Sequence, residues 1–232
     1  MPDASVRPWR YLLLGLVTFL LLGADMASVV VAKLLDGRAA SDPRLWSTNW
    51  YATVGGFLCS VAIWSAWVRV LWGWSRRRRV LGSLVRMQSG SKAWGIVLAG
   101  AVVLGFIGWA EARASGSGFP SVVAEHGGFV QLYGDRGTAV TAFQYLYYLL
   151  EAAMVLALVS LFQRAGEKWT RRTLVPWGGI ALSLSWGSAH LGTHPEGAVM
   201  VMLIALIYGV AFVFSEKSAP ATLALVYLGF VL

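Results

Sequence analysis

The sequence predicts an all-α membrane protein, a polytopic bundle of about seven transmembrane helices with a cytoplasmic N-terminus. Composition is the first reason: 57% of the 232 residues are hydrophobic, 13% are charged, and the mean hydropathy is +0.64, well outside the balance of a soluble domain. The 12 tryptophans and 8 tyrosines are the second, because amphipathic rings are enriched at the level of lipid headgroups. The third is that basic residues collect in short segments between apolar runs.

Seven runs are candidates for membrane helices, since a span needs about 20 mostly apolar residues. They cover residues 10–32, 50–72, 93–113, 138–163, 173–191, 196–215 and 219–232. The last run is short and stands at the C-terminus, so its full insertion is left open. The first is too long for a cleavable signal peptide. We expect an N-terminal three-helix membrane region over residues 1–137 and a second membrane region over residues 138–232.

The distribution of basic residues predicts the orientation. If the connection that holds arginines 76–79 is cytoplasmic, 14 of the 19 lysines and arginines lie on the cytoplasmic side, in agreement with the positive-inside rule. The N-terminus is then inside and the C-terminus outside, which predicts a multi-pass protein of the inner (plasma) membrane. The same arginines could bind nucleic acid or anionic lipid, but we interpret them as a topology signal with some attraction for lipid. The predicted partner is the lipid bilayer, and no nucleic acid is expected.

Two carboxylates lie deep inside the apolar runs, where an ionisable group is a candidate functional residue because its burial is costly. Asp25 stands among small residues in the first run, and a hydrogen bond between packed helices is the favoured explanation; its role stays open. Glu151 lies near the middle of the fourth run with no cation nearby in its own helix. Gln144, Tyr147 and Tyr148 precede it by seven, four and three residues, which predicts a polar face on this helix.

The stretch "WGSAHLGTHPEG" places two histidines between the fifth and sixth runs. His194, Pro195 and Glu196 are typical of a helix start, so His190 is the residue that needs another explanation. Counted from the cytoplasmic side at about 1.5 Å per residue, Glu151 lies roughly 18 Å deep and His190 roughly 26 Å deep. Ordinary helix tilt can close that gap. We therefore predict that Glu151 and His190 face each other in one cavity.

No metal site or cofactor is predicted. His190 and His194 stand four residues apart and could bind a metal with Glu151 or Glu196, but nothing in the sequence supplies a firm third ligand. The single cysteine, Cys59, excludes an internal disulfide framework and a cysteine-based zinc site.

Three stretches of the C-terminal part, "YYLLEAAMVLALVSLFQRAG", "SLSWGSAHL" and "ALIYGVAFVFSEKSAPATLALVYLGFVL", carry a family resemblance. From about residue 140 to its end the chain resembles the CAAX-processing and bacteriocin-processing (CPBP) family of intramembrane endopeptidases. That family has a Glu-Glu-x-x-x-Arg block, an aromatic-x-x-x-His block and a His-x-x-x-Asn/Asp block on successive helices. Glu151, Trp186 and His190 match the first glutamate, the aromatic residue and the first histidine. The resemblance implies that Glu151 and His190 activate a water molecule for attack on a peptide bond.

The chain departs from the family pattern at several positions. Ala152 stands where the family has its second glutamate, and Leu156 where it has arginine; Tyr227 and Val231 stand at or near the last histidine and Asn/Asp. The pair that steadies the oxyanion is thereby missing. Enzymatic activity is left open: the resemblance implies an endopeptidase acting on a membrane protein or peptide, or a non-catalytic homologue. The alternative from a different class is a non-enzymatic membrane scaffold that binds a lipid or a partner protein.

Overall fold

The computed structural model describes residues 6–37, 49–116, 118–192 and 197–232, and within these ranges the chain is helical, without a β-strand. The all-α fold class is therefore confirmed. The helices are α1 (Pro8–Leu22), α2 (Ala24–Leu35), α3 (Trp50–Arg77), α4 (Leu81–Leu84), α5 (Ser91–Ser115), α6 (Ser121–Tyr133), α7 (Gly137–Thr170), α8 (Trp177–Leu182), α9 (Ala198–Phe214) and α10 (Ala219–Val231). Short 3-10 or π-helical segments are η2 (Gly134–Arg136), η3 (Ser183–Gly187) and η4 (His190–Gly192).

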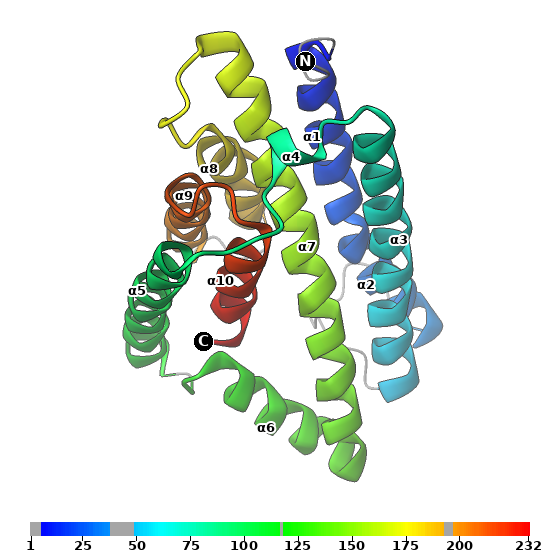
Figure 1. Ribbon diagram of the computed structural model, residues 1–232. Helices are drawn as coiled ribbons and strands as arrows, with labels where there is room; N and C mark the ends of the chain where they lie inside the picture. The colour runs from blue at the N-terminus through cyan, green and yellow to red at the C-terminus, as the bar shows by residue number, and fades with distance from the viewer. Residues whose placement is uncertain (1–5, 38–48, 117, 193–196) are drawn as a thin grey trace.

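Helix α7 is the centre of the fold. It runs the length of the molecule, with α1 and α3 on one side and α8 and α10 on the other (Figure 1). Its middle is apolar around most of its circumference, as expected of a helix that is covered from several directions. Met154, Val155, Leu158 and Val159 are fully buried there.

One large core cluster surrounds α7. It contains Trp64 of α3 and Val97 of α5 together with Leu158, Phe212 and Leu225 from the later helices. The helices of both predicted regions, 1–137 and 138–232, thus contribute to the same apolar core.

Three helical stretches of the described residues are long and apolar enough to cross a membrane. They are Trp50–Arg77, Ser91–Ser115 and Ser121–Thr170, the last of which combines α6, η2 and α7. Helix α5 also leaves large apolar side chains uncovered, with Leu98 69% and Phe106 66% exposed. Apolar surface of this extent is expected where lipid is the solvent. These features support a bilayer environment, whereas the number of seven crossings stays a prediction.

The first apolar run, residues 10–32, is two helices rather than one. Helix α1 ends at Leu22 and α2 begins at Ala24, and the amide of the intervening Gly23 donates to the carbonyl of Phe19 at 3.2 Å. A glycine without a side chain weakens a helix interior, which explains why the break falls at this residue.

The fifth run, residues 173–191, is irregular where one helix was predicted. Helix α8 spans only six residues and continues into the π-helical η3. The hydroxyls of Ser185 and Ser188 donate to the carbonyls of Ala181 and Leu184, both at 2.7 Å. Side-chain hydrogen bonds of this type compete with the backbone ladder, and π-helical turns are frequent at functional sites.

The basic connections lie together at one end of the molecule. Figure 1 shows the N-terminus, α4 and the last turn of α7 at this end, and α6 at the opposite end. The arginines 76–79 therefore share an end with the basic segment 164–172, as the positive-inside orientation requires.

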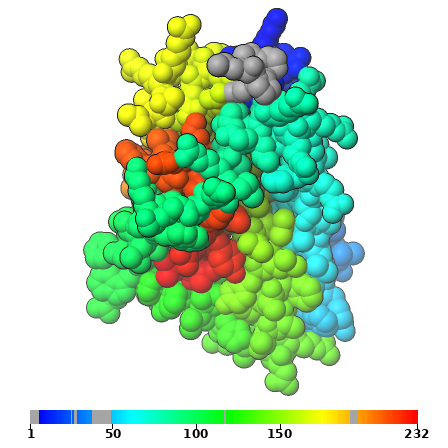
Figure 2. Space-filling view, in the orientation of Figure 1, coloured from blue at the N-terminus to red at the C-terminus, as the bar shows by residue number. Residues whose placement is uncertain are grey.

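The segment between α3 and α5 closes this end of the bundle. Figure 2 shows it lying across α7 and the turn between α9 and α10. The Arg86 amide donates to the carbonyl of Lys217, and the Ala219 amide donates to the carbonyl of Arg86, each at 2.7 Å. Val80 and Leu84 pack with Leu161 of α7 in a second apolar cluster.

Candidate functional site

Glu151 lies in the buried middle of α7, with 8% of its surface exposed. The hydroxyls of Tyr148, one turn earlier, and of Tyr208 on α9 lie within electrostatic range of its carboxylate. Tyr208 is fully enclosed, and its hydroxyl donates a long hydrogen bond of 3.5 Å to the carbonyl of Val226 on α10. Helices α7, α9 and α10 therefore pack against one another in this part of the core.

A polar network continues from Tyr148 along α7 to α6. Nε2 of Gln144 donates to the Tyr148 hydroxyl at 2.8 Å, and that hydroxyl donates to Glu125 at 2.8 Å. Gln144 is 1% exposed, and its Oε1 has no hydrogen-bond partner within the described residues. The polar face predicted from Gln144 and Tyr148 thus contacts a second carboxylate.

The ring of Tyr147, four residues before Glu151, packs toward α3. Its ring packs against Phe57 and Trp64 of α3, with centroid distances of 5.2 Å and 4.9 Å. Tyr147 and Tyr148 differ in direction by about 100° around the helix axis, so the ring of Tyr147 contacts α3 while the hydroxyl of Tyr148 reaches Glu125 on α6.

Glu125 belongs to none of the seven predicted runs, because residues 114–137 lie between the third run and the fourth. The segment forms α6, in which Val122 and Phe129 are buried seven residues apart. Positions 122, 125, 126 and 129 share one face of a helix. That periodicity would have placed Glu125 and His126 on the inner side, where Nδ1 of His126 lies 3.0 Å from the Thr141 hydroxyl.

His190 is anchored to its own segment. Its Nδ1 lies 2.8 Å from the carbonyl oxygen of Trp186, and its ring packs edge-on against the Trp186 indole at a centroid distance of 5.0 Å. Because a carbonyl can only accept, Nδ1 must carry the hydrogen of this bond. A neutral His190 then presents Nε2 as an acceptor.

An aromatic cluster joins the surroundings of Glu151 to His190. The ring of Phe230 on α10 stacks on Tyr148 at 5.2 Å and contacts Trp186 edge-on at 6.2 Å. Tyr148, Phe230, Trp186 and His190 thus form one continuous set of rings. The direct approach of Glu151 to His190 stays a prediction.

Apolar packing occupies the positions at which the chain departs from the CPBP pattern. Ala152 is fully buried in the main core cluster, and Leu156 and Tyr227 pack against it. Val231 is the last residue of α10. No group of three or more His, Cys, Asp or Glu able to hold a metal ion occurs within the described ranges.

Several predicted residues lie outside the described part of the chain. They are His194, Pro195 and Glu196, together with the side chain of Asp25. The helix start predicted for the first three and the packing role predicted for Asp25 therefore stay predictions.

The fold and its exposed apolar helices define an α-helical protein of the membrane class. In comparisons with models of known protein families, with characterised proteins and with solved structures, nothing matches the chain. The interpretation of the site therefore depends on its residues and their geometry.

Proposed function

We propose that the chain is a non-cleaving homologue of the CPBP endopeptidases, which binds a segment of a membrane protein or a peptide beside Glu151 and His190. The main support for this proposal is Ala152, which follows Glu151 and is buried in apolar packing where the family has its second glutamate. A water-activating site needs a base of tuned pKa and a preorganised donor for the oxyanion. Glu151 could serve as a base, but the second acid, the arginine and the final His and Asn/Asp are replaced.

The groups that remain are suited to holding a peptide. Glu151 accepts hydrogen bonds, the Tyr148 hydroxyl both donates and accepts them, and Nε2 of His190 accepts them. Inside a membrane, an unpaired backbone amide has no water to bond with and costs several kcal/mol. A site that offers buried partners to such amides would therefore bind an irregular or extended segment of another membrane protein.

Binding without cleavage is the expected result when immobilised protein is incubated with a panel of apolar peptides. Peptides should be retained with unchanged mass, and Glu151→Gln should weaken retention about tenfold, because the neutral amide of glutamine accepts a weaker hydrogen bond than a carboxylate does. Retention and peptide mass are measured by elution and mass spectrometry. Glu111→Gln, on an exposed position of α5, is the matched control and should behave as the parent protein.

A glutamate peptidase is the second candidate, favoured by the burial of Glu151 beside Tyr208. Glu151 would take a proton from water as the hydroxide attacks the carbonyl carbon, and would return it to the leaving amine. In that case the parent protein and Glu111→Gln should both release peptide fragments. The rate of fragment release should fall by about 100-fold or more with Glu151→Gln. This result would replace the binding proposal with the peptidase.

In the proposed topology the protein crosses the inner (plasma) membrane seven times, with its N-terminus in the cytoplasm. A reporter that is active only outside the cytoplasm should be silent when it is joined after Leu84, because the arginines 76–79 hold this connection inside. The same reporter joined after Gly116, beyond α5, should be active. Reporter activity in whole cells is the measurement, and the reverse pattern would contradict the orientation.

A further inference from the structure

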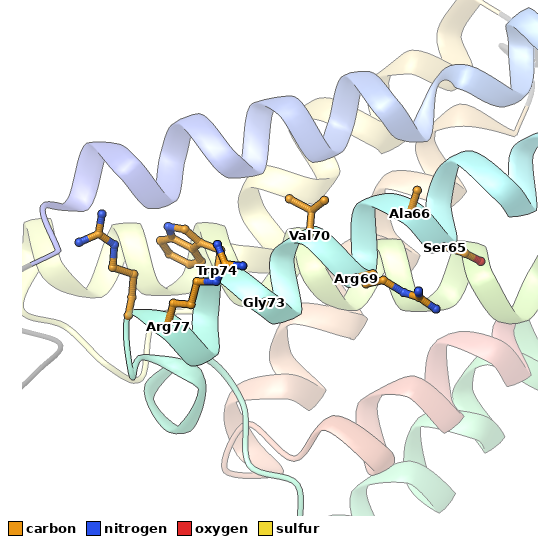
Figure 3. Close-up of a pocket in the computed structure, with 8 residues that line it drawn as sticks. Ser65, Ala66, Arg69, Val70, Gly73, Trp74 and Arg77 are labelled. Atoms are coloured by element: carbon orange, nitrogen blue, oxygen red, sulfur yellow. The ribbon is translucent and has the colours of Figure 1, made fainter.

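A hollow of about 940 Å³ lies along the outer side of α3, apart from the residues around Glu151 (Figure 3). Ala66, Val70 and Gly73 line its apolar part, and Trp74, Arg77 and Arg78 line the part at the basic end of the helix. The hollow is open to its surroundings, since its described lining residues all belong to α3 or directly follow it and most of them are exposed.

Glycine at position 73 keeps this part of the hollow open. A Cβ built on Gly73 would meet no other atom within 4 Å, so the space beside it is free and a larger side chain could occupy it. The apolar lining extends from there toward the middle of α3, along Val70 and Ala66.

Geometry divides the four consecutive arginines into two pairs. Arg77 and Arg78 line the hollow, whereas Arg76 and Arg79 do not. Arg69 lies on the same face of α3 two turns earlier and also lines it. Within the described residues, no ion pair joins Arg69, Arg77 or Arg78 to a carboxylate. The hollow therefore combines an apolar wall with positive charge.

We infer that this hollow binds one anionic phospholipid of the cytoplasmic leaflet. Guanidinium groups match the oxygens of a phosphate in geometry and charge, and basic pockets at this level of a membrane protein are suited to acidic headgroups. Trp74 provides the amphipathic ring expected at the headgroup level. The wall formed by Gly73, Val70 and Ala66 would hold the upper part of an acyl chain, which soluble phosphate lacks.

This inference requires that the end of α3 faces the cytoplasmic surface, but it is independent of what binds beside Glu151. The probe is phosphatidylglycerol added to the full-length protein in a neutral detergent, with phosphatidylcholine as the uncharged reference. Native mass spectrometry measures the apparent dissociation constant of the first bound lipid. We expect phosphatidylglycerol to bind at least about tenfold more tightly than phosphatidylcholine.

Two double variants with the same change of charge distinguish a site from a general attraction. Arg77→Gln with Arg78→Gln should weaken phosphatidylglycerol binding at least about tenfold, whereas Arg76→Gln with Arg79→Gln should change it less than about twofold. Equal losses in the two double variants would overturn the proposal, since net charge would then explain the binding.

A third variant tests the apolar part without changing the charge. Gly73→Leu has room for its side chain and should weaken phosphatidylglycerol binding at least about threefold by filling the hollow, with the melting temperature unchanged. Parent-like binding by this variant would overturn the lipid assignment. So would inorganic phosphate that competes as well as phosphatidylglycerol does, because the site would then recognise the phosphate alone.

Discussion

Replacement of Gly209 by valine is expected to prevent the protein from reaching a stable folded state. Gly209 of α9 faces Gly179 of α8 so closely that a Cβ on Gly209 would overlap the backbone nitrogen and the Cα of Gly179. These neighbours are backbone atoms, which cannot rotate away as a side chain can. Small residues at such crossings are what allows two membrane helices to approach. We expect a loss of about 3 kcal/mol or more, the upper range for overpacking.

The matched control is Gly55→Val on α3. Gly55 is also helical, but a Cβ there would meet no atom within 4 Å. The melting temperature and the monodisperse fraction in size-exclusion chromatography are measured for both variants in detergent. Gly55→Val should resemble the parent protein, and Gly209→Val should aggregate or melt far lower. Similar behaviour of the two variants would show that α8 and α9 do not pack as described.

Glu167→Gln is expected to produce the second largest loss of stability. Glu167 is buried in the last turn of α7, with its carboxylate 2.7 Å from Nζ of Lys217 and 3.1 Å from Nη1 of Arg164. Removing one partner of a buried ion pair leaves the other charges uncompensated. Both cations keep some contact with water, so we expect a cost of about 2–4 kcal/mol. For a chain of this size, that corresponds to a melting temperature lower by about 4–16 °C.

Glu216→Gln is the control for this prediction. Glu216 pairs with Arg86 on the surface, where its side chain is 55% exposed, and exposed pairs contribute little. The melting temperature of this variant should change by less than about 2 °C. Adding Lys217→Met to Glu167→Gln should restore part of the loss, because it removes an uncompensated charge. A buried ion pair would be contradicted if Glu167→Gln and Glu216→Gln lowered the melting temperature equally. It would also be contradicted if adding Lys217→Met increased the loss of stability caused by Glu167→Gln.

Glu151 was predictable from the sequence as a buried carboxylate, whereas its neighbours were predictable only in part. Hydropathy alone shows that it stands in the middle of an apolar run. Tyr148 and Gln144 follow from helical periodicity. Tyr208 comes from a helix more than 50 positions later, and nothing local to either segment indicates that they meet. Glu125 lies on α6, which was not predicted because the apolar content of residues 114–137 is low.

The sequence by itself determined the helical class, the apolar stretches and the end of the bundle at which positive charge collects. These properties depend on each segment's own composition and on its transfer between water and lipid, which can be evaluated one stretch at a time. Only the tertiary structure decided the burial of Glu167 and the division of the four arginines by the hollow on α3. Each of these depends on how far a helix is rotated about its axis and on which distant helix packs against it. Those are properties of the packed bundle, because no single segment contains both partners of the contact.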